Sequence, residues 1–259
     1  MELSLLPIWT TEGTLHGPGR VNFLYDLDTR DMAAMPSFRK PKLRGCLSLF
    51  VPVGDGEDDD HEGGGGGSLY LMVRELREVR RHKIEVGQPS MDFEVLFYGN
   101  GRTTSHCKLL PLPPFVLEPI RKNELPEIRS YAVVNGGSHI CVSVDGRGTY
   151  TLDTASHTWD KVGDWTLPIH GKVEYVPELK LWFGLSGDAQ HLAAADLSTM
   201  DAHSPPQLAA GHGWEEFQPP EKWAEQGLQI DQEDVQLVNL GSGRFCIARF
   251  FDRRLAGEP

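Results

Sequence analysis

The stretch GTYTLDTASHTWDKVGDWTLP, residues 148–168, decides the fold. It opens with an alternating segment that ends at Asp153, and a short polar turn follows. Trp159 stands six residues after the aspartate, and Leu167-Pro168 closes the stretch. Alternation with period two predicts β-strands on both sides of a turn. The question is whether this is a single hairpin or one copy of a repeated unit.

The same order of residues occurs elsewhere in the chain. Asp196 follows a second apolar run, and Asp26 follows a third near the N-terminus. In the segment EVLFYGNGRTTSHCKLLPLPP, residues 94–114, Tyr98 stands at the aspartate position. The spacing is 43 residues from Asp153 to Asp196 and 55 residues from Tyr98 to Asp153. Periods of roughly 40–50 residues are typical of propeller blades.

Turn residues divide the rest of the chain into short apolar runs, since 28 glycines and 18 prolines are spread along it. This punctuation predicts an all-β fold with little helix. The expected strands are Val21–Leu27, Cys46–Val53, Leu69–Val73, Phe93–Tyr98, Ser130–Val134, His139–Val144, Thr149–Leu152, Val173–Val176, Leu179–Leu185, His191–Ala195, Val235–Leu240 and Phe245–Phe251.

Each repeat is expected to form a four-stranded antiparallel sheet that buries its faces by stacking on its neighbours. The aspartates Asp153 and Asp196 are interpreted as acceptors for backbone N–H groups in the following turn, rather than as catalytic acids. Trp159 is expected to be buried against its own sheet and the next one in sequence. Leu181 and Phe183 are its predicted neighbours.

The residues 131–168 and 171–197, YAVVNGGSHICVSVDGRGTYTLDTASHTWDKVGDWTLP and GKVEYVPELKLWFGLSGDAQHLAAADL, carry a family resemblance. They resemble an uncharacterised family of plant proteins with kelch-like β-propeller repeats, of the F-box-associated type. The resemblance implies a β-propeller of about four to five four-stranded blades, with no assigned activity. It covers Phe93–Leu197 well and the flanks more weakly.

We expect one propeller domain over residues 21–252, with an N-terminal extension at 1–20 and a C-terminal tail at 253–259. The acidic and glycine-rich segment 54–68 is predicted to be a disordered insert between two strands of one sheet. The C-terminal strands, together with Val21–Leu27 and Met32–Ser37, could complete one blade and close the ring. An open, truncated propeller is the alternative.

Composition restricts the class of partner. Lys and Arg number 25 against 37 Asp and Glu, a net charge of -12 that argues against nucleic-acid binding. The four cysteines are far apart, which argues against a compact zinc site and favours a reducing compartment. There is no run of roughly 20 apolar residues. We expect a monomer in the cytoplasm, the nucleus or both, with no membrane contact.

The sequence contains no catalytic constellation that we recognise. GLSGD at 184–188 lacks the spacing of a nucleophile elbow, and GNGRTT at 99–104 lacks the ending of a phosphate loop. We predict a non-enzyme with no cofactor and no catalytic, cofactor-binding or metal residues. His139 is interpreted as a solvated loop residue rather than a channel residue. A set of tryptophans is interpreted as core rather than as a carbohydrate platform: Trp159, Trp165, Trp182 and Trp214.

The leading functional expectation is a scaffold or substrate-recognition module that binds a protein partner. Plant kelch-type propellers often serve as substrate receptors in ubiquitin ligases, so the resemblance points the same way. The twenty or so residues before Val21 are too few for an F-box, so such a role would need a separate adaptor. The alternatives are a carbohydrate-binding or sugar-processing propeller, and a truncated gene product without retained function.

Overall fold

The computed structural model of the chain describes residues 5–8, 22–26, 32–35, 39, 46–52, 67–74, 87–98, 106–118, 126–187, 191–209, 220–225 and 228–253. Helix within these ranges is confined to α1 (Glu221–Glu225) and two short 3-10 turns, η2 (Pro114–Leu117) and η3 (Asn135–Gly137). All other regular elements are β-strands, and every strand predicted from the sequence overlaps an observed one. The expectation of an all-β fold is confirmed.

The chain divides into two compact units. The first unit comprises residues 1–127 together with Leu152–Trp159, and the second comprises Ile128–Thr151 and residues 160–259. The short segment Leu152–Trp159 therefore belongs to the first unit although its flanking strands continue into the second. Each unit contains sheets of its own, which are described in turn.

The first sheet of the first unit has the order β1-β2-β3, with β1 at Leu5–Ile8, β2 at Asn22–Asp26 and β3 at Met32–Met35. Both pairs are antiparallel. Strand β1 lies inside residues 1–20, which were predicted to be an N-terminal extension.

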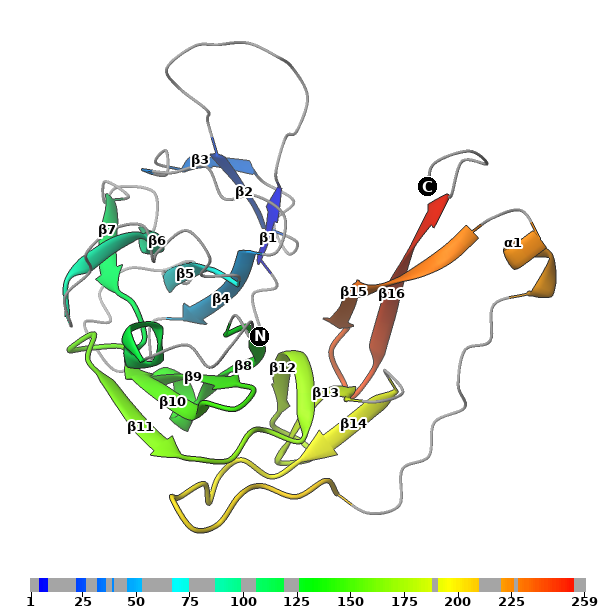
Figure 1. Cartoon of the computed structure of the whole chain (residues 1–259). Helices are drawn as coiled ribbons and strands as arrows, with labels where there is room; N and C mark the ends of the chain where they lie inside the picture. The colour runs from blue at the N-terminus through cyan, green and yellow to red at the C-terminus, as the bar shows by residue number, and fades with distance from the viewer. Residues whose placement is uncertain are drawn as a thin grey trace. The chain divides into compact units, whose positions relative to one another are not determined.

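The second sheet of this unit is a four-stranded antiparallel meander (Figure 1). Its strands are β4 (Cys46–Pro52), β5 (Gly67–Val73), β6 (Pro89–Tyr98) and β7 (His106–Pro111). Alternate residues of β4 are buried, as the two-residue period of a strand requires. Leu71, Phe93 and Val95 from the two central strands are almost fully buried.

The predicted insert 54–68 does join two neighbouring strands of one sheet, because β4 pairs with β5. Its C-terminal boundary was wrong, since Gly67 and Ser68 are part of β5. A Cβ at Gly67 would lie 2.2 Å from the ring of Phe50, so the last glycine of the run is needed for packing. The prediction of disorder for the rest of the insert falls outside the described residues.

The second unit is built on a seven-stranded sheet with the order β11-β10-β9-β8-β12-β13-β14 (Figure 1). The strands are β8 (Ile128–Val134), β9 (His139–Val144), β10 (Gly148–Asp153), β11 (Trp159–Gly163), β12 (Ile169–Val176), β13 (Leu181–Ser186) and β14 (Leu192–Ala195). Strands β8, β9, β10 and β11 follow one another through short turns and form one meander. Strands β12, β13 and β14 form a second meander in the same way. The meanders meet where β8 and β12 pair in parallel.

Buried apolar residues from both meanders form one core. The cluster contains Ala132, Val134, Cys141, Leu167, Ile169, Val173, Trp182, Ala195 and Leu197. Burial raises the pKa of the Cys141 thiol to about 12, so this cysteine stays protonated and acts as a small apolar residue.

The C-terminal strands β15 (Leu228–Asn239) and β16 (Phe245–Arg253) form an antiparallel two-stranded sheet. Strand β16 extends one residue into the predicted tail. Among the described residues, these strands and the N-terminal strands β1–β3 form separate sheets. The hypothesis that they join in one blade stays a prediction.

Candidate functional site at the turn between β10 and β11

The turn after β10 is organised by the carboxylate of Asp153. Its Oδ1 accepts hydrogen bonds from the backbone N–H of Ala155 at 2.9 Å and of Ser156 at 2.6 Å, and from the Ser156 hydroxyl at 3.0 Å. The backbone carbonyl of Asp153 also accepts from the N–H of His157 at 2.9 Å. The interpretation of Asp153 as a turn residue is confirmed.

Asp196 plays the same part after β14. Its Oδ1 accepts from the backbone N–H of Ser198 at 2.9 Å and from the Ser198 hydroxyl at 2.6 Å. These hydrogen bonds lower the pKa of the Asp196 carboxyl. Asp201, which the sequence did not single out, accepts from the N–H groups of His203 and Ser204 in a third turn of this kind. Carboxylates with such partners lock turns.

Three side-chain hydrogen bonds hold the Asp153 turn against sheet β4–β7, which belongs to the same unit. The Tyr70 hydroxyl donates to the carbonyl of Thr154 at 3.3 Å. Nζ of Lys108 lies 3.1 Å from Nδ1 of His157, and Nε1 of Trp159 donates to the carbonyl of Pro111 at 2.9 Å. We call Tyr70, Phe93, Lys108, His157 and Trp159 the docking cluster.

The rings of the docking cluster pack on one another. Phe93 lies between two partners, with ring centroids 6.0 Å from Trp159 and 6.3 Å from Tyr70. The rings of Tyr70 and His157 are 6.4 Å apart. Tyr70 and Phe93 are buried, whereas Trp159 is half-buried. Aromatic pairs at these distances contribute about 0.5–1.5 kcal/mol beyond their buried area.

The neighbours predicted for Trp159 were wrong, because they belong to the strands that follow Trp159 in sequence. Trp159 packs on Phe93 and Pro111, from the sheet that precedes it in sequence. Phe183 lies instead in a cluster with Val176 and Ala194, and Leu181 packs against that cluster. The ring was also expected to be largely buried, but Trp159 is only half-buried.

The protonation states of the cluster follow from its contacts. Burial, and then the nearby charge of Asp153, raise the pKa of Tyr70 to about 12, so the phenol remains a donor at neutral pH. Desolvation and the charge of Lys108 lower the pKa of His157, against a smaller opposing effect of Asp153. Because an ammonium can only donate, Nδ1 of His157 must accept, and the imidazole is neutral with its proton on Nε2.

The contacts of the docking cluster hold the Asp153 turn in place. The Tyr70 hydroxyl and the Lys108 ammonium are both donors to the turn, and His157 Nδ1 is occupied as an acceptor. Nε2 of His157 is buried and has no hydrogen-bond partner in the structure, as far as the described residues go. The described geometry therefore supports docking of the turn on sheet β4–β7.

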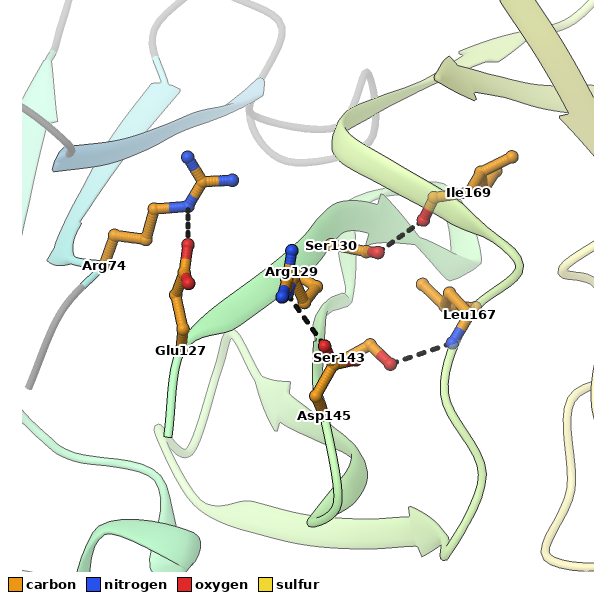
Figure 2. A network of polar contacts seen from close by, with 8 residues as sticks. All are labelled: Arg74, Glu127, Arg129, Ser130, Ser143, Asp145, Leu167 and Ile169. Carbon is orange, nitrogen blue, oxygen red and sulfur yellow. Dashed lines mark hydrogen bonds and ion pairs between the residues drawn. The ribbon is translucent and has the colours of Figure 1, made fainter. Parts of the chain in front are cut away.

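A second polar arrangement, in the second unit, fastens the segment that ends in Leu167-Pro168. The fully buried hydroxyls of Ser130, Ser143 and Thr149 come from β8, β9 and β10. Ser143 accepts from the N–H of Leu167 at 2.8 Å, and the Ser130 hydroxyl donates to the carbonyl of Ile169 (Figure 2). Thr149 donates to the carbonyl of Trp165 at 2.7 Å.

The hydrogen bonds of this arrangement run in one direction. Since Thr149 uses its proton on Trp165, the 3.0 Å contact between the hydroxyls must be a donation from Ser143 to Thr149. The chain is therefore Leu167 N–H to Ser143 to Thr149 to the Trp165 carbonyl, and we call it the hydroxyl chain. Successive hydrogen bonds of this kind polarise and strengthen one another.

Three of the other residues considered in the sequence lie in the described part of the chain: Trp165, Trp182 and His139. Trp182 is buried and donates to the carbonyl of Val133 at 3.3 Å, and Trp165 donates to the carbonyl of Asp201 at 2.9 Å. Buried or half-buried tryptophans favour the core interpretation over a carbohydrate platform. Trp214 lies outside the described residues. His139 is half-buried and contacts the Ser138 hydroxyl through Nδ1 at 2.8 Å.

The sequence analysis missed Tyr70, Lys108 and His157. They come from three elements, β5, β7 and the turn, and no local motif connects them. No group of three or more His, Cys, Asp or Glu side chains in the described ranges is arranged to hold a metal ion. Of the helices that can be described, none has the length and apolar character needed to cross a bilayer.

The fold and these two polar arrangements define an all-β protein made of consecutive antiparallel meanders. The chain belongs to the family described as protein of unknown function (DUF1668), whose model matches residues 8–258. The resemblance to an uncharacterised family is thus confirmed at the level of a domain of unknown function. A search of curated proteins finds no match.

Among solved structures, the chain is similar to the Cps50 (Swd1) β-propeller domain of Myceliophteria thermophila, with 10% sequence identity and a TM-score of 0.26. The alignment covers 73% of this chain and 64% of the propeller chain, so this chain spans less than two thirds of the length of that structure.

Proposed function

We propose that the chain is a non-enzymatic, kelch-like β-propeller that binds a protein partner as a scaffold or substrate-recognition module. The proposal includes a monomeric state and a place in the cytoplasm or nucleus. Consecutive four-stranded meanders support the propeller architecture, because this is the form of a blade. Turns locked by Asp153 and Asp196 at corresponding positions support a repeat.

The observation that carries the binding proposal is an exposed apolar surface in the second unit. Leu179, in the turn between β12 and β13, is 53% exposed, and Leu240, after β15, is 55% exposed. The two hairpins meet, because the rings of Phe183 and Phe245 stack at 5.0 Å. Leu179 Cδ1 is also 3.9 Å from where a Cβ of Gly243 would lie.

Two further exposed apolar side chains lie on the same two hairpins. Tyr175 on β12 and Val238 on β15 are each 37% exposed. Single exposed leucines are common on any protein, but several on adjoining hairpins are typical of an interaction site. We call Tyr175, Leu179, Val238 and Leu240 the apolar hairpin surface. It suits a partner that presents apolar side chains.

The test is quantitative affinity purification of the tagged full-length chain from its native tissue. Leu179→Glu and Leu240→Glu should each remove the specific partners, with at least a tenfold loss of signal, because a buried charge opposes an apolar contact. Leu117→Glu, at an exposed leucine of the first unit, is the matched control. Equal recovery of the same partners by wild type and both variants would overturn the proposal.

A further inference from the structure

The contact between Lys108 and His157 joins two groups that become mutually repulsive when the histidine gains a proton. While His157 is neutral, Nζ of Lys108 donates a hydrogen bond to Nδ1 of His157 at 3.1 Å. Protonation places a second N–H on the ring, which removes the acceptor and adds a second positive charge at the same distance. The link from β7 to the turn then becomes unfavourable.

Among the described residues, the charged and titratable groups around His157 come from three strands. Lys108 is on β7, Tyr70 is on β5, and Asp153 is the last residue of β10. Tyr70 is an uncharged donor to Thr154 and offers no compensation. The Asp153 carboxylate is already occupied by three hydrogen bonds within the turn, so one engaged carboxylate stands against two cations.

We propose that the turn Leu152–Trp159 is an acid-sensitive latch, which protonation of His157 releases from sheet β4–β7. Release removes the Lys108 link and weakens the two others, from Tyr70 and Trp159. It uncovers the rings of Tyr70 and Phe93, which the docked turn helps to bury. Acidification thereby changes the apolar surface of the first unit, and this inference does not depend on the identity of any partner.

The direction of the pH effect follows from proton linkage. The pKa of His157 is lowered in the docked state, so the released state binds more protons below the ordinary histidine value. Docking is fully stable above pH ~6.5 and weakens as the pH falls from that value towards the pKa of the docked ring. The docking equilibrium constant falls about tenfold for each pH unit that separates the pKa of the docked ring from that of the released ring.

The experiment is hydrogen exchange of the intact chain followed by mass spectrometry at pH 7.5 and pH 5.5. Rates are corrected for intrinsic pH dependence, and a peptide covering β12 and β13 serves as the internal reference. Protection of the peptide covering residues 152–160 should fall at the lower pH relative to the reference. Unchanged relative protection of that peptide would overturn the latch.

Three variants separate the latch from general acid sensitivity. His157→Gln keeps a side-chain acceptor for Lys108 but cannot take a proton, so its turn should lose the acid response. Lys108→Met should raise the pKa of His157, measured by NMR titration of the ring, and reduce the response. This second variant decides the matter if His157→Gln fails to dock. His139→Gln should respond as wild type does. An acid response that persists in Lys108→Met with an unshifted His157 pKa would refute the inference.

Discussion

Ser143→Ala tests whether the hydroxyl chain fastens the segment that ends in Leu167-Pro168. Ser143 is fully buried, and Leu167 is 3% exposed. Removing the hydroxyl takes away the acceptor of the Leu167 N–H and the donor to Thr149. A buried N–H left without a partner costs about 1–3 kcal/mol. For a protein of this size, Tm should fall by roughly 2–4 °C for each kcal/mol.

The assay is a thermal melt followed by circular dichroism, with Ser138→Ala as the matched control. Ser138 is an exposed serine next to β9, so its loss should change stability by less than about 0.5 kcal/mol. The double variant Ser143→Ala/Thr149→Val should show a coupling of about 0.5–3 kcal/mol, because both residues belong to one chain of hydrogen bonds. Strictly additive effects, or equal melts for Ser143→Ala and Ser138→Ala, would refute the reasoning.

Two further substitutions test the turns of the same region by thermal melts. Gly148→Ala should be more destabilising than Gly146→Ala. Both glycines have positive φ, but they differ in the space around them. A Cβ at Gly148 would lie 2.2 Å from a carbonyl oxygen of β11, while Gly146 faces open space. Equal costs would show that β11 can move away. Trp159→Phe should lose about 1 kcal/mol with the hydrogen bond to Pro111, and Trp159→Ala more, because it also loses the Phe93 contact. An unchanged Tm for Trp159→Ala would contradict the docking of this ring.

The sequence predicts the strands and the aspartate turns well because both depend on local chemistry. Alternation identifies a strand wherever one face is buried, and the Asp153 turn is closed by residues within three positions of it. Strand β1 was not predicted from the sequence, because it has only four residues and contains Pro7. Proline is tolerated there because β1 is at the edge of its sheet.

The position of Trp159 shows where local reasoning ends. The repeat hypothesis predicts an aromatic residue at the start of β11, but alternation cannot tell which neighbouring sheet that residue meets. The docking cluster is harder still to foresee, because Tyr70 and Thr154 are 84 positions apart and Lys108 and His157 are 49 apart. Such contacts arise from the packing of sheets, and no short motif encodes them.

The Leu-Pro segments nevertheless suggest a way to find buried polar anchors from the sequence. Thr149, the last hydroxyl of the hydroxyl chain, lies 18 positions before Leu167-Pro168. Glu94 lies 18 positions before Leu112-Pro113 in the preceding sheet, and it is also fully buried. Both residues stand on the third strand of a four-stranded meander, β10 and β6. A buried polar residue therefore stands on the third strand of both meanders, at the same spacing from a Leu-Pro pair.

The two anchors have different hydrogen-bond partners. The Thr149 hydroxyl donates to the carbonyl of Trp165, which is part of the following segment. The Glu94 carboxyl accepts from the thiol of Cys107 on the adjacent strand β7 at 2.9 Å, and from the backbone N–H of Arg39 at 3.2 Å. A buried carboxyl needs more donors than a hydroxyl does, because its desolvation costs more. The spacing to the Leu-Pro pair is thus the same for both anchors, while the local partners determine which polar group can occupy the position.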